Sequence, residues 1–387
     1  MVKAIKVMLI PNNVQKTKMF QYAGASRFAY NWALAREIEN YEKGGKFISD
    51  AELRKEFTKL RHSDEYAWLL NISNNVTKQA IKDACTAYKN FFKGLQKFPR
   101  FKSKKRSMPK FYQDNVKIQF SNTHVKLEGF SSSRKANKQK MNWVRLAEHG
   151  RIPTDVKYMN PRISFDGLNW WISVCVEFPD CRETLNDDGV GIDLGIKDLA
   201  VCSDGTKYKN INKSQKVKKL EKQKRRLQRS ISRSYEKNKK GESYCKTNNV
   251  IKKEKLLLKR NHRLTNIRKN YLNQTISEII NRKPRFICIE DLNVSGMMKN
   301  RHLSKAVQEQ GFFWFRKQLE YKCSDKGIQL IVADRFYPSS KLCSCCGNIK
   351  KDLKLSDRVY RCACGNMIDR DFQASINLKT YGEQFAS

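Results

Sequence analysis

Three acidic residues stand next to apolar segments at widely separated positions of the sequence. Asp193 lies between two glycines in the segment GIDLG, Glu290 follows the apolar residues 286–289, and Asp371 stands at the start of the last apolar segment. Carboxylates that end neighbouring strands of one sheet can converge, and carboxylate oxygens bind Mg²⁺ well. Two such ions, about 3.5 to 4 Å apart, can activate a water molecule and stabilise the leaving oxygen of a phosphodiester. The sequence therefore predicts a two-magnesium site, although other acids have similar surroundings: Asp198, Asp204, Asp291, Asp334 and Asp369.

A cluster of cysteines has the spacing of a metal site. Five of the 12 cysteines lie within residues 343–364, in the segments CSCCG and CACG. Four thiolates form a closed tetrahedral zinc site, and a glycine after each pair permits the positive φ angle of a zinc knuckle. Because a closed site has no open position, its ion should be structural; ordinary thiols or a redox pair are the alternative. The expected ligands are Cys343, Cys346, Cys362 and Cys364, and Cys345 could replace one of the first two.

Apolar patterns predict the elements that position both sets of residues. A long helix over residues 213–233 carries ten Lys or Arg and a single acid, and a helical partner follows a lysine-rich break at 237–246. The cysteine segment interrupts this part of the chain rather than following it. The other expected elements are antiparallel strands at 190–195, 199–203 and 206–211, strands at 285–289 and 327–333, and helices at 312–323 and 369–378.

The residue pattern of the N-terminal part predicts a small β-barrel with a helical insertion. Residues 2–10 alternate as a strand does, and about ninety residues with helical periodicity follow. The segment 97–110 contains seven basic residues between and beside two prolines, so we expect a basic linker there. Asp166 and Gly167 are typical of a hairpin turn. Further strands are expected at 116–120, 124–127, 143–146, 163–165 and 170–178.

The charge of the chain indicates a polyanionic partner. There are 78 Lys and Arg against 38 Asp and Glu, a formal net charge of +40. Nucleic acid is the expected partner, and a ribosome-associated, merely basic or membrane-surface protein is the alternative. Candidate phosphate contacts lie in the linker and the basic helix: Lys97, Arg100, Lys102, Lys104, Lys105, Arg106, Lys218, Lys222, Arg225, Arg226 and Arg229.

No apolar run approaches the roughly 20 residues of a membrane-spanning helix. The first ten residues also lack the apolar region of a signal peptide. We therefore expect the protein to act inside a prokaryotic cell, in the cytoplasm or at the nucleoid.

The ordered motifs resemble TnpB, the family of RNA-guided nucleases encoded by insertion sequences. The resemblance rests on GIDLGIKDLAVCSDG, ICIEDLNVSGM, the cysteine segment and DRDFQASINL, and on KFPRFKSKKR further upstream. It extends over nearly the whole chain. Gln373 stands where this family commonly has Asn, and the second cysteine pair is CxC instead of CxxC.

The resemblance implies an α/β multidomain fold. A β-barrel wedge domain, residues 1–12 and 108–184, would carry an inserted helical recognition lobe, residues 13–107. An RNase H-like RuvC nuclease domain, residues 185–336 and 366–387, would carry an inserted zinc ribbon, residues 337–365. The matching nuclease carboxylates are Asp193, Glu290 and Asp371, the last being the second aspartate of Asp-Arg-Asp.

The resemblance also implies the activity and the partners. TnpB proteins pair an RNA made from the transposon end with double-stranded DNA beside a short adjacent motif, and cut that DNA with Mg²⁺. We expect a monomeric protein in a ribonucleoprotein, with two catalytic magnesium ions and one structural zinc ion. A miniature type V CRISPR effector, a guided DNA-binding regulator without cleavage and a guide-free transposase remain as alternatives.

Overall fold

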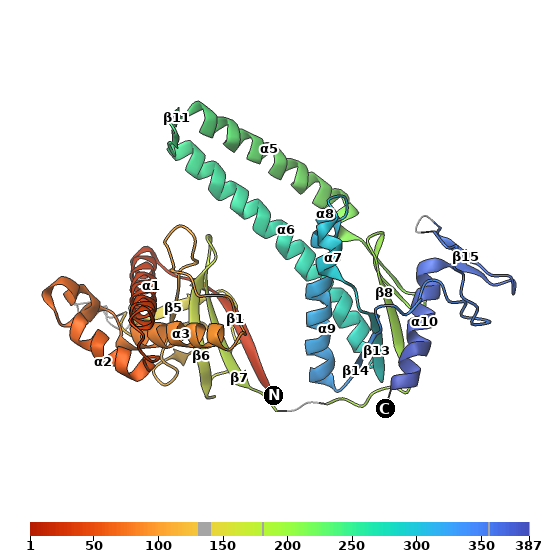
Figure 1. Ribbon diagram of the computed structural model, residues 1–387, viewed down its shortest axis with the longest axis horizontal. Helices are drawn as coiled ribbons and strands as arrows, with labels where there is room; N and C mark the ends of the chain where they lie inside the picture. Colours follow the sequence, from red (N-terminus) through yellow and green to blue (C-terminus); the bar gives the residue numbers. More distant parts are fainter. Residues whose placement is uncertain (131–140, 180–181, 355–356, 387) are drawn as a thin grey trace. The chain divides into compact units, whose positions relative to one another are not determined.

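The chain folds into two compact units, Met1–Pro179 and Asp180–Ser387. The computed structural model, drawn in Figure 1, describes residues 1–130, 141–179, 182–354 and 357–386. Each unit has its own sheet and its own buried core. None of the helices in these ranges is long and apolar enough to cross a membrane.

One antiparallel sheet forms the strand part of the first unit. Its order is β2-β6-β7-β1-β5-β4-β3. The first strand pairs with β7 from Val2 opposite Glu177 to Leu9 opposite Trp170, so the N-terminal strand lies inside this sheet, as the sequence leads us to expect. The strands are β1 (Val2–Ile10), β2 (Lys110–Tyr112), β3 (Gln119–Phe120), β4 (His124–Lys126), β5 (Trp143–Leu146), β6 (Tyr158–Phe165) and β7 (Trp170–Glu177).

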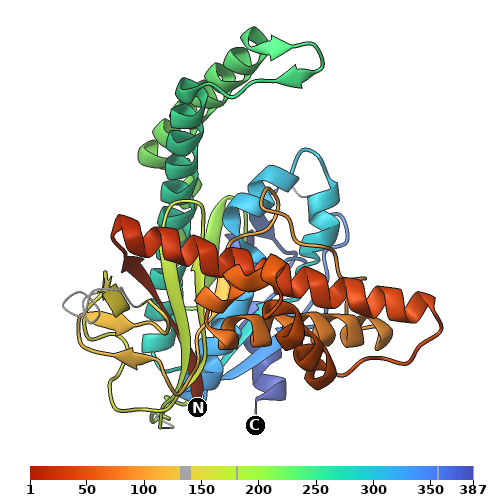
Figure 2. The same cartoon turned by 90° about the vertical axis from the view of Figure 1, so that its left-hand side faces the viewer.

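A helical insertion lies between β1 and β2 in the chain (Figure 2). It comprises α1 (Asn13–Glu42), α2 (Asp50–Arg61), a 3₁₀ turn (Asp64–Asn71) and α3 (Asn74–Phe92). Helix α1 begins with a capping box, in which Asn12 and Gln15 each accept a hydrogen bond from the backbone of the other. Gln15 Nε2 also donates to the carbonyl of Trp143 in β5 at 2.9 Å, which ties the insertion to the sheet. The basic segment 97–109 forms neither helix nor strand, as its prolines predict.

The strand predicted at 116–120 is wrong except for its last two residues, which form β3. Asp114 instead folds the preceding segment into a turn. Its carboxylate accepts hydrogen bonds from the backbone N–H groups of Val116 and Lys117 at 3.0 and 3.1 Å. Val116 is consequently 85% exposed, because local side-chain hydrogen bonding to the backbone replaces sheet pairing there.

The second unit contains a mixed five-stranded sheet of order β10-β9-β8-β13-β14. Strands β8, β9 and β10 are consecutive and antiparallel, as predicted, whereas β13 runs parallel to both β8 and β14. The strands are β8 (Val190–Leu194), β9 (Asp198–Cys202), β10 (Lys207–Lys209), β13 (Phe286–Glu290) and β14 (Gln329–Ala333).

Helices cover both faces of this sheet (Figure 1). Ile287 and Ile289 of β13 pack in one core with helices α6 (Asn248–Asn281) and α9 (Phe312–Lys326). Phe286 and Cys288 point to the opposite face, where they pack with Leu378 of helix α10 (Arg370–Phe385). Since successive side chains of a strand alternate between faces, β13 is buried on both sides. Two short helices, α7 (Val294–Lys299) and α8 (Ser304–Gln310), connect β13 to α9.

The predicted helical hairpin is present. Helix α5 (Gln215–Lys237) and helix α6 run side by side, joined through the two-residue strands β11 (Lys239–Lys240) and β12 (Ser243–Tyr244) (Figure 1). Val217, Leu220 and Leu264 form a small buried cluster between them. Ile231 of α5 and Val250 of α6 are buried as well, and most basic side chains of α5 are exposed.

A buried acid in the helical insertion should make the stability of the first unit depend on pH. Glu37 is 1% exposed, and its Oε1 has no hydrogen-bond partner among the described residues. Burial raises the pKa of Glu37 above its ordinary value of 4.5, against the opposing hydrogen bond from the Ile48 N–H group. A raised pKa in the folded state means that the charged form opposes folding increasingly as the pH rises above 4.5.

Glu37→Gln should therefore stabilise the chain at pH 7 by about 1 kcal/mol, or roughly 2 to 4 °C in melting temperature. The gain should shrink when the thermal melt is repeated near pH 4. At that pH, Glu37 of the wild type is mostly protonated in both the folded and the unfolded state. Glu42→Gln, on the exposed surface of the same helix, is the matched control. Equal shifts for the two variants would show that the buried charge is not the cause.

Candidate active site and metal centre

Asp193, Glu290 and Asp371 line one cavity of about 600 Å³ in the second unit. In the parallel pair β8 and β13, Ile192 lies opposite Ile289, so Asp193 and Glu290 follow at the same edge of the sheet. Asp371 is the second residue of α10, which packs across β8. The topology thus brings three acids together from positions nearly 180 residues apart.

The close approach of α10 to β8 depends on Gly191. A Cβ atom at this position would lie 2.0 Å from the carbonyl oxygen of Ser375 and 2.4 Å from the backbone nitrogen of Lys379. Such distances are far inside van der Waals contact, so only glycine lets the helix backbone rest on the strand. This contact sets the position of Asp371 relative to Asp193.

The three carboxylates have different surroundings. Although Asp193 remains partly exposed in the cavity, desolvation by the surrounding protein, followed by repulsion from Glu290 and Asp371, raises its pKa to about 8. Glu290 Oε1 accepts a hydrogen bond from Ser339 Oγ at 2.9 Å, and Asp371 Oδ1 pairs with Arg370 at 3.1 Å. No hydrogen bond from a described residue to the Asp193 carboxylate is seen, and the charge of Arg370 lowers its pKa less than burial and the neighbouring acids raise it.

The donor set suits magnesium. All three candidate ligands offer carboxylate oxygens, and the partly desolvated, repelling charges would be relieved by a divalent cation. Among the described residues, the four cysteines are the only group of three or more possible ligands close enough to hold one metal ion together, so the three carboxylates lie further apart around the cavity.

Three of the other acids that the sequence could not eliminate have hydrogen-bond or ion-pair partners of their own. Asp369 caps α10 by accepting hydrogen bonds from the N–H groups of Asp371 and Phe372, both at 3.1 Å. Burial alone would raise the pKa of Asp369, but the Phe372 N–H group and Lys207 lower it overall. Asp291 pairs with Arg316 and Arg335, and Asp204 with Arg282. Asp198, Asp204, Asp291, Asp334 and Asp369 are not among the residues that line the cavity.

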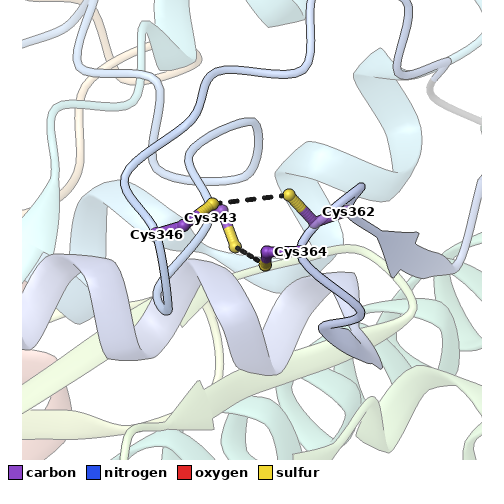
Figure 3. Close-up of side chains that lie close together, drawn as sticks. All are labelled: Cys343, Cys346, Cys362 and Cys364. Atoms are coloured by element: carbon purple, nitrogen blue, oxygen red, sulfur yellow. Dashed lines mark hydrogen bonds between the residues drawn. The ribbon is translucent and has the colours of Figure 1, made fainter.

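The structure brings the four predicted cysteine ligands together (Figure 3). The sulfur atoms of Cys343 and Cys364 lie 3.7 Å apart, those of Cys346 and Cys362 lie 3.6 Å apart, and all four lie within 4.8 Å of one another. Cys345 is exposed and outside this group.

Two turns with the expected glycines present these cysteines. Gly347 and Gly365 have φ angles of 71° and 89°, which a side chain would disfavour. Burial opposes ionisation of Cys343, but the Asn366 side chain and the N–H groups of Cys346 and Cys345 lower its pKa to about 6. The thiolate form of Cys343 is therefore favoured, as a zinc ligand requires. Against the Asn366 N–H group, the Cys346 and Cys362 thiols raise the pKa of Cys364 to about 12.

A two-stranded hairpin links the cysteines to the carboxylates. Strands β15 (Val359–Arg361) and β16 (Met367–Asp369) are antiparallel, and β16 leads directly into α10 and Asp371. Buried Tyr360 joins the two cysteine turns by donating to the carbonyls of Lys341 and Asn348, at 3.1 and 3.3 Å. The other described cysteines are free thiols, and Cys181 lies outside the described residues.

The basic residues predicted on α5 share one surface. Five of them line a cavity of about 610 Å³, together with Lys305 of α8, which the sequence did not single out. The two acids of this cavity, Glu221 and Glu309, both pair with Arg268 of α6, at 3.1 and 3.3 Å. No ion pair engages the five basic residues within the described ranges: Lys218, Lys222, Arg225, Arg226 and Arg229.

The linker residues divide into two groups. Lys102 turns inward, with its Nζ 3.0 Å from the centre of the Tyr30 ring, and burial lowers its pKa to about 7. The backbone of Lys102 exchanges two hydrogen bonds of 2.8 Å with the Asn31 side chain. Lys102 therefore anchors the linker to α1, and the exposed residues are Lys97, Arg100, Lys104, Lys105 and Arg106.

Three family models match the chain. One described as "Helix-turn-helix domain" covers residues 1–46, one described as "Probable transposase" covers 173–301, and one described as "Cas12f1-like, TNB domain" covers 312–378. The last span includes helix α9, the cysteine cluster, Asp371 and the first part of α10.

Two relatives match over nearly the full chain. A protein of Escherichia coli (strain K12) named "Putative RNA-guided DNA endonuclease InsQ" is 31% identical over 93% of this chain and 87% of its own length. A protein of Streptomyces pristinaespiralis named "Putative RNA-guided DNA endonuclease" is 29% identical over 98% and 89%.

A solved structure described as a Cas12f1-sgRNA-target DNA complex has a similar fold. It aligns with a TM-score of 0.62 over 98% of both chains, at 12% identity. At this level of identity the likeness concerns the fold alone.

Proposed function

The chain belongs to the TnpB family of insertion-sequence proteins, and from this premise we propose that it is an RNA-guided DNA endonuclease. The observation that carries the proposal is the cavity in which Asp193, Glu290 and Asp371 meet. We assign the second unit as the RNase H-like RuvC domain with its zinc ribbon, and the first as the wedge barrel with its helical recognition lobe.

The residues of the cavity have separate tasks in this proposal. Asp193 is close enough to be repelled by both other acids. Ser339 donates a hydrogen bond to one oxygen of Glu290, and Arg370 pairs with one oxygen of Asp371. Asp193 and Glu290 would hold one Mg²⁺, and Asp193 and Asp371 a second. Bound there, the ions would supply a hydroxide nucleophile and neutralise charge on the phosphodiester. Lys197, Lys213 and Arg358 also line the cavity and would attract the DNA backbone.

Guide RNA from the transposon end would pair with one DNA strand and supply the sequence specificity. The protein would recognise the shape of the heteroduplex through its basic surfaces. The basic face of α5 and the exposed residues of the linker support this assignment. The five basic residues of α5 that line the cavity form no ion pair with any described residue, and the linker residues are exposed.

A miniature type V CRISPR effector is the second candidate, favoured by the match of residues 312–378 to the Cas12f1-like domain. Against it, the sequence of a Cas12f1 endonuclease of Sulfoacidibacillus thermotolerans aligns with only 19% of this chain, whereas the sequences of the two relatives named as RNA-guided DNA endonucleases align with over 90%. A CRISPR array beside the coding sequence would favour this candidate.

Sequencing of the RNA that copurifies with the protein, expressed with its native flanking DNA, tests the guided function. We expect one discrete RNA with a constant scaffold and a 3′ segment that continues beyond the element. Heterogeneous RNA, or none, would contradict a guide-dependent enzyme and would favour a guide-free nuclease or transposase.

The cysteine site gives a separate prediction. Purified wild-type protein should contain one zinc ion, held by four thiolates at about 2.3 Å. Cys345→Ser should keep this ion, because Cys345 lies outside the sulfur cluster, whereas Cys346→Ser should lose most of it. Elemental analysis of the two variants measures the difference. Loss of zinc from Cys345→Ser, with retention in Cys346→Ser, would reverse the ligand assignment.

A further inference from the structure

Ser339 connects the ribbon segment, residues 337–365, to a carboxylate of the cavity. The residue is 2% exposed, and its hydroxyl group donates to Glu290 Oε1 at 2.9 Å. Its carbonyl oxygen accepts a hydrogen bond of 2.7 Å from Asn377 Nδ2, on the buried face of α10. Ser339 thus joins β13 to α10 at the point where the chain enters the ribbon.

The same face of α10 also forms hydrogen bonds with the first cysteine turn. Asn377 Nδ2 and Gln373 Nε2 each donate to the carbonyl of Leu342 at 2.7 Å, next to the ligand Cys343. Gln373 is fully buried.

Gln373 contacts both cysteine turns. Its Oε1 accepts from Ser344 Oγ at 3.0 Å and from Asn366 Nδ2 at 3.2 Å. Asn366 Nδ2 lies 3.4 Å from Cys343 Sγ. Because Asn366 follows the second cysteine turn, Gln373 connects both turns to the helix that carries Asp371.

These contacts make the position of the carboxylates depend on the cysteine turns. Ser339, Gln373 and Asn377 are buried, so a hydrogen-bonding group of these side chains that loses its partner stays unsatisfied, which is costly. With four thiols free to separate, the segment 339–343 would lose its fixed end at Cys343. Its hydrogen bonds to α10 and to Glu290 would then weaken together.

We propose that the cysteine ribbon is a positioning element of the nuclease site, and that Ser339 is the residue through which it orients Glu290. The four cysteines, which would hold a zinc ion, keep the segment 339–343 in place, and Ser339 then orients the Glu290 carboxylate for binding a divalent ion. Ser339 is a positioning residue, since it acts through Glu290. That loss of Ser339 slows DNA cleavage rests on the proposed function. That loss of Ser339 weakens ion binding does not.

The test measures Mn²⁺ binding to the full chain without nucleic acid, by electron paramagnetic resonance. Ser339→Ala should weaken Mn²⁺ binding roughly 10- to 100-fold, as is usual when a group that orients a metal ligand is removed. Its zinc content should remain that of the wild type, which excludes loss of the ribbon as the cause.

Ser375→Ala is the matched control. Ser375 is equally buried, and its hydroxyl group donates to the carbonyl of Phe372 in the same helix, not to a carboxylate. We expect its Mn²⁺ affinity to stay within about twofold of the wild type. Wild-type Mn²⁺ affinity in Ser339→Ala would overturn the inference.

A double-mutant cycle tests the path from zinc to Glu290. Cys346→Ser should also weaken Mn²⁺ binding, and adding Ser339→Ala to it should cause little further loss, because both changes remove the same support. Independent, multiplicative losses would overturn the proposed path. If Cys346→Ser does not fold, removal of zinc from the wild type and from Ser339→Ala with a chelator replaces it.

The outcome is separable from that of the proposed function. Absence of guided cleavage by a wild-type protein that binds Mn²⁺ in an Asp193-dependent way would contradict the endonuclease, but not the role of Ser339. Guided cleavage by Ser339→Ala at the wild-type rate and the wild-type Mg²⁺ requirement would contradict the role of Ser339, but not the endonuclease.

Discussion

Replacing Asp193 by asparagine should reduce DNA cleavage on the order of 10³-fold or more. The change removes the carboxylate charge that interacts with both other acids of the cavity, but it keeps the size and shape of the side chain. Charge stabilisation by a bound metal ion is worth several kcal/mol, and each 1.36 kcal/mol corresponds to a factor of ten in rate. Single-turnover cleavage of a guide-matched duplex at saturating protein measures the loss.

Binding separates a catalytic role from a structural one. The affinity of the Asp193→Asn protein for its RNA and for target DNA should change by less than about threefold. The basic residues of α5 line a different cavity, which does not include Asp193. Asp198→Asn is the matched control, since Asp198 begins the neighbouring strand β9 and does not line the cavity. Comparable loss of RNA binding and cleavage in Asp193→Asn, or equal loss in Asp198→Asn, would argue against the assignment.

Neutralising the basic face of α5 should weaken RNA binding strongly. Lys222, Arg225 and Arg229 lie three and four residues apart, on one face of the helix, and line the same cavity. None of them forms an ion pair with another described residue. The triple change to glutamine should lower affinity on the order of 10- to 100-fold at about 0.15 M salt. It should also reduce the magnitude of the salt dependence of log K by roughly 2 to 3, as expected for lost phosphate contacts.

A triple variant with the same change in net charge is the control. Lys46, Lys55 and Lys59 are exposed in the helical insertion of the first unit, away from α5 in sequence. Their replacement by glutamine should alter affinity far less if the α5 face binds RNA locally. Equal effects of the two triple variants would indicate a response to overall charge only.

The sequence predicts the framework of the candidate site well because its signals are local. The apolar strands that contain Asp193, next to the last residue, and Glu290, at the last residue, appear as expected. Their parallel pairing brings both acids to one edge of the sheet. The CxxC and CxC spacings likewise predict the sulfur cluster, since each cysteine pair needs only its own turn.

The residues that support the site could not be predicted because their signal is not local. Ser339 lies 49 residues from Glu290 in sequence, and a serine in a loop has no pattern that indicates such a partner. Lys102 belongs to a run of cations, and only the packing of Tyr30 and Asn31 distinguishes it from its exposed neighbours. Asp369 and Asp371 are distinguished by the helix start, which makes the first a cap and leaves the second for the cavity.

Boundaries were harder to predict than elements. The last helix continues to Phe385, seven residues beyond the predicted end, because Leu378 and Tyr381 pack against the sheet face that includes Phe286. The strand predicted from Val116 is absent at its first residues because a local contact replaces sheet pairing there. The Val116 N–H group donates to the Asp114 carboxylate instead of to a neighbouring strand.

Rewriting the guide tests the central claim most directly. Protein purified with its own RNA, and protein assembled with the same RNA carrying a rewritten 3′ segment, are each incubated with the two matching DNA duplexes. We predict that each complex cuts only the duplex that its own 3′ segment matches, in the presence of Mg²⁺, and that Asp193→Asn cuts neither. Cleavage of both duplexes irrespective of the RNA, or undiminished guided cleavage by Asp193→Asn, would contradict an RNA-guided nuclease that acts from this cavity.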